Sequence, residues 1–424
     1  MDYMYTGNMI IVDLENREVQ ERSLDDEIID RLLGGAAINN TLYREFQDKD
    51  PVIIGTGLFT SSMIPCSSMS VMTARSPING KVMHAPIVNF MGAELKLAGF
   101  DFIVIHGRSD EPAYLWLHDE IADIVPAKDI WGKDTWKTVD YIRDEQGEER
   151  IQVVSIGQAG ENKGTIAQFI VNYWSEGDKV GFGARLGEMQ LKAIGTRGMG
   201  ELEVADTESF FDLCVAAIED ARKRLGGDRG IRSLIPSYAS LKNFDEIKHR
   251  DSACFGCPWP CRTFVKYNEP ASVLKEGVEE PGVLIVDAPG YLAFLNAGFD
   301  AIESARLLEL ASRFGIEPIN AATLIHGQKF ENAKESLVNI ASRKSDASSI
   351  ISVEGACRSD VFSPFAPNGG DEITIALAYI LGICPRYAAK IGIDIERVSE
   401  FIKVCADLDM DPSNLKALAK SLFT

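Results

Sequence analysis

Three cysteines stand close together in a short segment that reads DSACFGCPWPCR (residues 251–262). Their C-x₂-C-x₃-C spacing, at Cys254, Cys257 and Cys261, lets one tight loop turn all three sulfurs to the same side. Two prolines in the segment stiffen that loop, because each fixes φ and removes a backbone donor. Thiolates placed in this way can share one metal centre, and a 4Fe–4S cluster needs four of them.

The fourth thiolate must come from another part of the chain, which has eight cysteines in all. Cys384 follows Gly382 at an expected helix end, where glycine permits a sharp turn. Cys214 and Cys405 fall in apolar helical patterns, which is typical of small buried side chains. The residues alone favour Cys384 but leave the choice open among the remaining cysteines, which are Cys66, Cys214, Cys357, Cys384 and Cys405.

Zinc is the alternative metal for such a set, because four thiolates also suit tetrahedral Zn²⁺. The chain could then be a zinc-stabilised structural module. Zinc sites generally use two C-x₂-C pairs, however, whereas here a triple array would be completed by one distant cysteine. The spacing therefore favours an iron–sulfur cluster over zinc.

The elements that must position these residues change in character along the chain. Residues 1–205 alternate short apolar runs with turn residues, which predicts strands at Met9–Leu14, Pro51–Gly57, Ser68–Ala74, Phe102–Gly107, Tyr114–His118 and Ile151–Gly157. Two helices interrupt them. One is expected to be capped by Ser23, with Ile28, Ile29, Leu32 and Leu33 on its apolar face, and the other spans Gly92–Gly99.

Helical periodicity replaces this pattern after Asp206. Apolar residues recur at three- and four-residue spacing until Leu225-Gly226-Gly227 ends the run, and further helices are predicted at Ala301–Phe314, Ala333–Ala341, Glu372–Leu381 and Ile395–Leu408. Loops are expected at Ser342–Ser349 and Ser363–Gly370. The predicted fold class is α+β, with a β-rich domain over residues 1–205 and mostly helical domains over 206–424 that carry the cysteines.

Composition narrows the functional classes. The 424 residues carry a formal net charge of −20, which argues against binding nucleic acid or an anionic membrane. The start of the chain lacks the basic and apolar regions of a secretory signal. The longest apolar stretch, Ile373–Cys384, is about half the length of a membrane-spanning helix. We therefore expect a cytoplasmic protein.

Several motifs follow one another in an order typical of a known family. They are TGNMIIVDLENREV near the start, Ser76-Pro77, GAELKLAGFDFIVIHGRSDEPAYLWL, Ile130–Trp136, Ile156–Asn162 and Leu191–Ile194. In these motifs the chain resembles the tungstopterin aldehyde:ferredoxin oxidoreductase (AOR) family. The C-x₂-C-x₃-C array matches the cluster ligands of that family, and Gly382-Ile383-Cys384 matches its later fourth ligand. The resemblance thus implies a 4Fe–4S cluster on Cys254, Cys257, Cys261 and Cys384.

The same resemblance implies an N-terminal β domain as a base for the metallopterin, helical domains over it, and electron transfer to ferredoxin. The pterin motifs depart from the family pattern, at Met69, Pro86–Asn89, Gly177–Ala184, Ser312 and Tyr379. A catalytic carboxylate would correspond to Glu279 or Glu280. These departures indicate a degenerate tungstopterin site and an electron-transfer protein that works with ferredoxin or another redox subunit, as a homo- or hetero-oligomer. The alternative is a complete enzyme that oxidises an aldehyde to a carboxylate.

Overall fold

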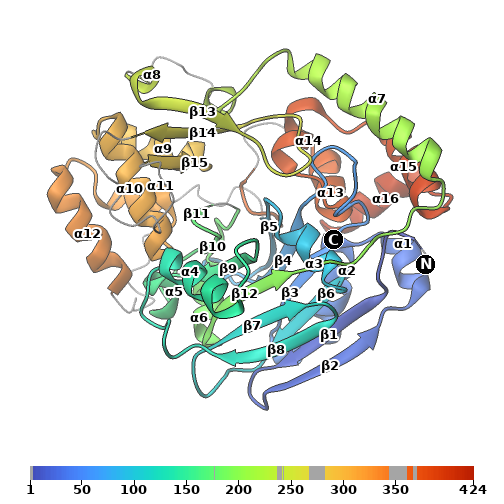
Figure 1. The fold of residues 1–424 in the computed structure, drawn as a ribbon, viewed down its shortest axis with the longest axis horizontal. Coiled ribbons are helices and arrows are strands. Elements are labelled where there is room, and N and C mark those ends of the chain that lie inside the picture. Colours follow the sequence, from blue (N-terminus) through green and yellow to red (C-terminus); the bar gives the residue numbers. More distant parts are fainter. Residues whose placement is uncertain are drawn as a thin grey trace.

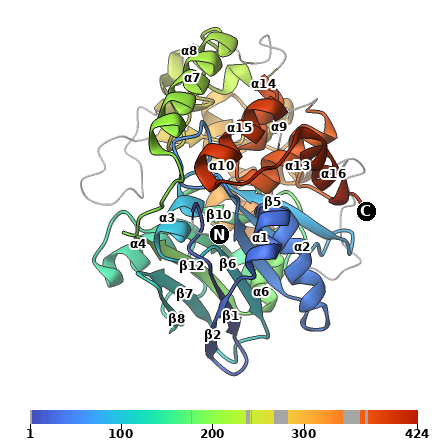
Figure 2. The same cartoon turned by 90° about the vertical axis from the view of Figure 1, so that its right-hand side faces the viewer.

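The computed structural model describes residues 3–175, 177–235, 241, 243–266, 282–342, 361–365 and 370–424. Two large sheets form one side of the molecule, and most of the long helices lie on the other side (Figure 1). A view turned by 90° keeps this separation, with the strands below and α7, α13, α15 and α16 above (Figure 2). The predicted α+β class, β-rich first and then mostly helical, is confirmed.

The first sheet has six strands in the order β2-β1-β6-β3-β4-β5. Its strands are β1 (Asn8–Asp13), β2 (Glu18–Ser23), β3 (Val52–Thr56), β4 (Ser70–Arg75), β5 (Val82–Ile87) and β6 (Phe102–His106). β1 and β6 run parallel, and the other neighbours are antiparallel. Every residue of β3 and β6 is buried, because both faces of the sheet are covered.

The second sheet has the order β11-β10-β9-β12-β7-β8. Its strands are β7 (Ala113–His118), β8 (Ile121–Pro126), β9 (Gln152–Ile156), β10 (Phe169–Val171), β11 (Trp174–Ser175) and β12 (Leu191–Arg197). Ile54 and Ile105 of the first sheet share a buried apolar cluster with Leu115 and Val154 of the second. The two sheets therefore pack face to face around a common core.

Short helices connect and flank these strands. They are α1 (Asp26–Leu32), α2 (Gly35–Glu45), η1 (Gln47–Lys49), α3 (Met91–Leu97), α4 (Thr135–Gln146), α5 (Gln158–Glu161) and α6 (Phe182–Glu188). The expectation that Ser23 caps the first helix is wrong. Ser23 is the last residue of β2, and the carboxylate of Asp25 instead accepts the N–H of Glu27 at 2.9 Å. An aspartate two residues later thus supplies the cap.

The second half supplies most of the long helices, together with several short ones. Its helical segments are α7 (Thr207–Leu225), η2 (Ile231–Ser233), α8 (Phe244–Ile247), α9 (Ala288–Asn296), α10 (Ala301–Phe314), α11 (Pro318–Leu324), α12 (Phe330–Ser342), α13 (Glu372–Leu381), α14 (Pro385–Ile391), α15 (Ile395–Ala406) and α16 (Pro412–Ser421). Ser342 closes α12, and residues 343–349 and 366–369 of the two expected loops lie outside the described residues. No helix in the described part of the chain has the length and apolar character needed to cross a membrane.

The second half also contains a small antiparallel sheet that the helical interpretation missed. It has the order β13-β14-β15, from β13 (Lys248–Ser252), β14 (Arg262–Lys266) and β15 (Gly282–Ile285). The sequence of β13, KHRDS, has no alternation of apolar and polar residues, so the usual strand signal is absent. This sheet matters because the loop between β13 and β14 contains the cysteine array.

Candidate metal centre

Five cysteine side chains from three distant segments line one cavity. Cys254, Cys257 and Cys261 lie on the loop that joins β13 to β14. The pairing of Ser252 with Arg262 closes this hairpin directly before and after the array. Strand pairing therefore brings the ends of the loop together and turns the three thiols toward the cavity.

Cys384 reaches the cavity from a turn between two helices. α13 ends at Gly382, whose φ of 80° lies in the left-handed region that glycine adopts without penalty. Cys384 then stands at the N-cap of α14, directly before Pro385. The sharp turn expected at this glycine is present, and it brings Cys384 to the wall of the cavity that the three hairpin cysteines also line.

Cys66 arrives from the long loop between β3 and β4. Backbone hydrogen bonds join this loop to the α13–α14 turn: Phe59 N–H donates to Leu381 O at 2.9 Å and Met69 N–H to Gly382 O at 3.3 Å. A Cβ atom on Gly57 would lie 2.1 Å from the nitrogen of Gly382, so the backbones touch here. This contact fixes Cys66 and Cys384 against each other.

The cavity provides sulfur and little other ligand chemistry. None of the described residues that line it is histidine, aspartate or glutamate. The Sγ of Cys257 is engaged locally, since it accepts the Trp259 N–H at 3.4 Å and lies 3.2 Å from the Trp259 carbonyl oxygen. Trp259 is itself buried and lines the same cavity. Such a donor set suits thiophilic metals or clusters.

Burial and the proximity of other thiols raise the pKa values of Cys384 and Cys66 and favour their protonated forms. Burial is the main cause that raises the pKa of Cys384 to about 12, and the charges of Cys261 and Cys257 add to it. Burial likewise raises the pKa of Cys66 well above its ordinary value. Several thiolates could coexist here only beside a compensating positive centre, and a bound metal provides such a centre.

The four cysteines named by the resemblance thus lie together, with Cys66 as an additional neighbour. Within the described residues, no three Cys, His, Asp or Glu side chains are already arranged around a single metal position. Cys214 and Cys405 are fully buried in α7 and α15, as expected of small apolar side chains. Cys357 lies outside the described residues, as do Glu279 and Glu280.

Uncharged side chains occupy the positions where the resemblance implies pterin contacts. Met69, Val88 and Asn89 line the cysteine cavity beside the thiols. Tyr379 is buried and packs on Phe362, with ring centroids 4.4 Å apart. In α10, Ser312 turns back to donate to the carbonyl of Leu308 at 3.0 Å. None of these side chains brings a charge to a pterin ring.

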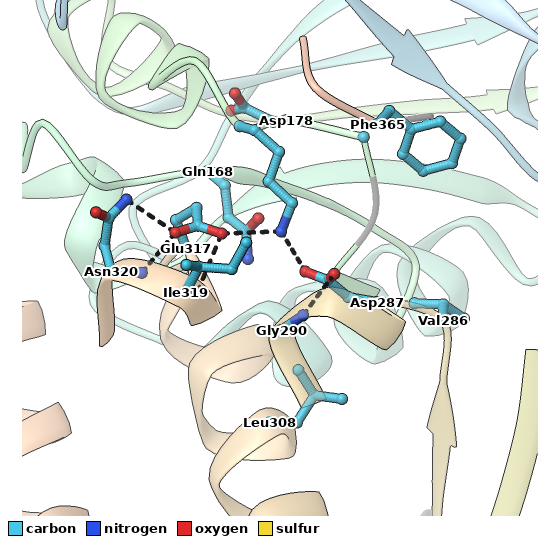
Figure 3. Close-up of polar contacts among 12 residues, drawn as sticks. Gln168, Asp178, Val286, Asp287, Gly290, Leu308, Glu317, Ile319, Asn320 and Phe365 are labelled. Atoms are coloured by element: carbon cyan, nitrogen blue, oxygen red, sulfur yellow. Dashed lines mark hydrogen bonds and ion pairs between the residues drawn. The ribbon is translucent and has the colours of Figure 1, made fainter. Parts of the chain in front are cut away.

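Lys179, on the glycine-rich loop that precedes α6, forms a buried ion triad with Asp287 and Glu317. The Lys179 amine donates to a carboxylate oxygen of Asp287 and, at 2.9 Å, to Glu317. Figure 3 shows the two carboxylates reaching toward this amine from the starts of α9 and α11. Burial alone would lower the pKa of Lys179, but the two carboxylates outweigh it and raise the pKa above its ordinary value.

Each carboxylate of the triad also caps a helix. Asp287 accepts the Gly290 N–H at 3.0 Å, and Glu317 accepts the N–H of Asn320 at 2.7 Å. The Lys179 backbone N–H donates to Ser363 Oγ at 3.1 Å. The only long cationic side chain of this loop is therefore committed to protein carboxylates.

Known proteins resemble this chain both in the sequence of its N-terminal part and in its fold. The family described as "Aldehyde ferredoxin oxidoreductase, N-terminal domain" matches residues 9–198, which include both large sheets. A solved structure, the active-site complex BamBC of benzoyl coenzyme A reductase with 1,5-dienoyl-CoA, superimposes with a TM-score of 0.81. The match covers 100% of this chain and 88% of the other at 18% identity, so it shows a shared fold.

Relatives in sequence are similar to this chain over part of their length. A tungsten-containing aldehyde ferredoxin oxidoreductase of Pyrococcus abyssi is 33% identical over 229 residues, which are 52% of this chain and 37% of that protein. The WOR-like subunit of an aliphatic sulfonate oxidoreductase of Pyrococcus furiosus is 26% identical over 367 residues, 76% of this chain and 58% of the relative. Residues 9–198 of this chain match the aldehyde ferredoxin oxidoreductase family, and the match covers part of the chain's length. It spans well under two thirds of these relatives.

Proposed function

We propose that this chain is an electron-transfer member of its family that holds one 4Fe–4S cluster on Cys254, Cys257, Cys261 and Cys384. The observation that carries the proposal is the convergence of these four thiols, from a hairpin loop and a helix N-terminus, on a cavity lined by no imidazole or carboxylate among the described residues. Sulfur-only sites of four cysteines suit iron–sulfur clusters. The final coordination would form as the metal binds, as is common for metal sites.

In this proposal the protein holds and tunes the centre. The hairpin loop and the turn at Gly382 orient the ligands. The Trp259 N–H donates to the Cys257 sulfur and so lowers the charge on that ligand. When bound, the cluster would supply single-electron transfer. Cys254 and Cys257 are partly exposed and Phe255 between them is exposed, so electrons need cross only a short distance to the surface.

We further infer that the chain works without tungstopterin. Phosphate groups of a pterin need cationic forks or bare backbone N–H groups. Here the cavity wall offers Met69, Val88 and the guanidinium of Arg386, which already donates to two backbone carbonyls. The Lys179 amine is likewise committed to two protein carboxylates. The residues present therefore do not fit that cofactor. Stoichiometric tungsten together with aldehyde-dependent viologen reduction would contradict this inference and favour the complete enzyme.

The proposed partner is ferredoxin or another redox subunit. One relative is named as a subunit, which supports a role within a larger redox assembly. We also propose a division into an N-terminal AOR-type domain over residues 1–205 and shortened helical domains over 206–424. The two six-stranded sheets end at β12 and α7 begins at Thr207, which agrees with that boundary.

Electron exchange with ferredoxin tests the proposed role. Anaerobically purified protein, reduced with dithionite and freed of excess reductant, should reduce added oxidised ferredoxin in an amount that follows its cluster content. A Cys261→Ser variant is the matched control, because it should lose both the cluster and the transfer. Transfer that is equal in the two proteins would contradict the proposal.

A further inference from the structure

Cys66 joins the two segments that supply the proposed ligands. Its backbone N–H donates to Gly256 O at 3.2 Å, within the array loop, and its carbonyl accepts the N–H of Cys384 at 3.0 Å. A single peptide segment thus contacts the hairpin loop on one side and the helix turn on the other. Cys66 lies at the junction of the whole ligand set.

The backbone of Cys66 adopts a conformation that side chains disfavour. Its φ is 65°, in the left-handed region, which is unfavourable for a residue with a Cβ. Glycine would adopt this conformation freely. Strained residues of this kind persist where the surroundings hold them, and here the two backbone hydrogen bonds do so. The conformation places a thiol in the cavity.

The thiol of Cys66 contacts one proposed ligand directly. Its Sγ donates to the Sγ of Cys257 at 3.1 Å, and only 2% of the residue is exposed. The contact joins residues 191 positions apart. A 4Fe–4S cluster uses four thiolates, so a fifth thiol at the same cavity has no iron of its own to bind.

We propose that Cys66 is a hydrogen-bond donor to the ligating sulfur of Cys257 and that it makes the reduction potential of the cluster less negative. The inference rests on the proposed cluster. The reduced cluster carries one more negative charge than the oxidised one, so a donor to a ligand sulfur stabilises the reduced form more. Cys66 acts through Cys257 and is therefore a positioning residue.

The test compares Cys66→Ala and Cys66→Ser with the wild-type chain. For each protein, iron per chain and the EPR-monitored midpoint potential are measured under anaerobic conditions. We expect all three to keep the same iron content. The alanine variant should show a more negative potential than the wild type, and the serine variant should show a less negative potential than the alanine variant because its hydroxyl still donates. Cys214→Ala, a buried cysteine that does not line the cavity, should keep the wild-type potential.

The possible failures can be told apart. An unchanged potential in Cys66→Ala overturns the role as a donor. Loss of iron in Cys66→Ala also overturns it, because Cys66 would then hold the cluster itself; the proposed electron-transfer role would stand, but the proposed ligand set would change. Wild-type protein without an iron–sulfur cluster overturns the proposed function and this inference together.

Discussion

At the residue scale, three of the proposed ligands are positioned by one short loop, whereas the fourth depends on a contact between distant segments. Cys254, Cys257 and Cys261 share one hairpin loop, so their spacing in the sequence already predicts that they meet. Cys384 needs the close approach of Gly57 and Gly382, two backbones far apart in sequence. Each ligand should nevertheless be necessary, because an iron left without its thiolate is bound less tightly.

Substitution of single ligands tests this set. Cys261→Ser and Cys384→Ser should each lose most of the iron and the broad visible absorption of the cluster. Cys405→Ser is the matched control, because Cys405 is fully buried in α15 and does not line the cavity. Iron assays and absorption spectra of the three variants give the result. Full iron content in Cys384→Ser would show that another cysteine completes the set.

A second residue-scale prediction concerns pH. Burial lowers the pKa of His84 in β5 from 6.5 to about 3. Because the folded-state pKa is depressed, neutral His84 makes its whole contribution to the free energy of unfolding above pH about 6.5. That contribution is lost as the pH falls toward 3. The unfolded chain binds a proton there that the folded chain does not, so the free energy of unfolding decreases by about 1.4 kcal/mol per pH unit.

The variant His84→Asn should flatten this dependence. Asparagine keeps a polar partner for Thr73, whose Oγ1 lies 2.7 Å from His84 Nδ1, but it does not titrate. Urea unfolding of both proteins between pH 4 and 7 measures the two slopes. Parallel curves for the variant and the wild type would contradict the assignment to His84.

At the element scale, the α13–α14 turn depends on contact with the β3–β4 loop. Gly382 and Gly226 both end helices in the left-handed region, with φ of 80° and 59°. A Cβ on Gly226 would meet open space, whereas one on Gly382 would lie 2.1 Å from Thr60 Oγ1. That hydroxyl cannot move freely, because it accepts from Gly57 N–H and donates to Met69 O.

Alanine substitutions at these two glycines separate the cost of the left-handed backbone from the cost of a steric clash. Both variants should lose about 1 kcal/mol of unfolding free energy, because alanine disfavours the left-handed conformation. Gly382→Ala should lose a further ~1–3 kcal/mol because its methyl group overpacks the contact with Thr60. Gly382→Ala should also hold less iron, since its turn carries Cys384. Urea unfolding and iron assays measure both effects. Equal losses of stability in the two variants would show that the close approach contributes nothing.

Element boundaries show what the sequence could and could not predict. α10 and α13 have the predicted bounds because their signals are local: Asp300 and Glu303 form a capping box, and glycines follow both helices. β13 was missed because it is short and polar and gains its pairing from β14. The contact of Cys66 with Cys257 could not be predicted either, because tertiary packing alone joins these positions.

At the scale of the whole molecule, the ion triad links the sheet half to the helical half. Lys179 precedes α6 at the sheets, while Asp287 and Glu317 begin α9 and α11. Removing the amine alone would leave two carboxylates buried without a cation, and breaking a buried pair in this way costs about 3–5 kcal/mol. The triad should therefore be a major link between the halves.

The variant Lys179→Met should reduce stability by about that amount in urea unfolding. Adding Asp287→Asn and Glu317→Gln removes the unpaired charges and keeps side-chain oxygens for the helix caps. The triple variant should therefore regain a large part of the loss. A triple variant as unstable as Lys179→Met would show that the charge of the carboxylates is not the cause.

We propose that the cysteine centre holds iron and sulfide and that the chain binds no tungstopterin. The most direct measurement is the metal content of anaerobically purified wild-type protein by mass spectrometry, read together with its visible spectrum. We predict about four irons per chain, a brown protein and no stoichiometric tungsten. A colourless protein with one zinc per chain, or tungsten equal to the chain concentration, would contradict the account.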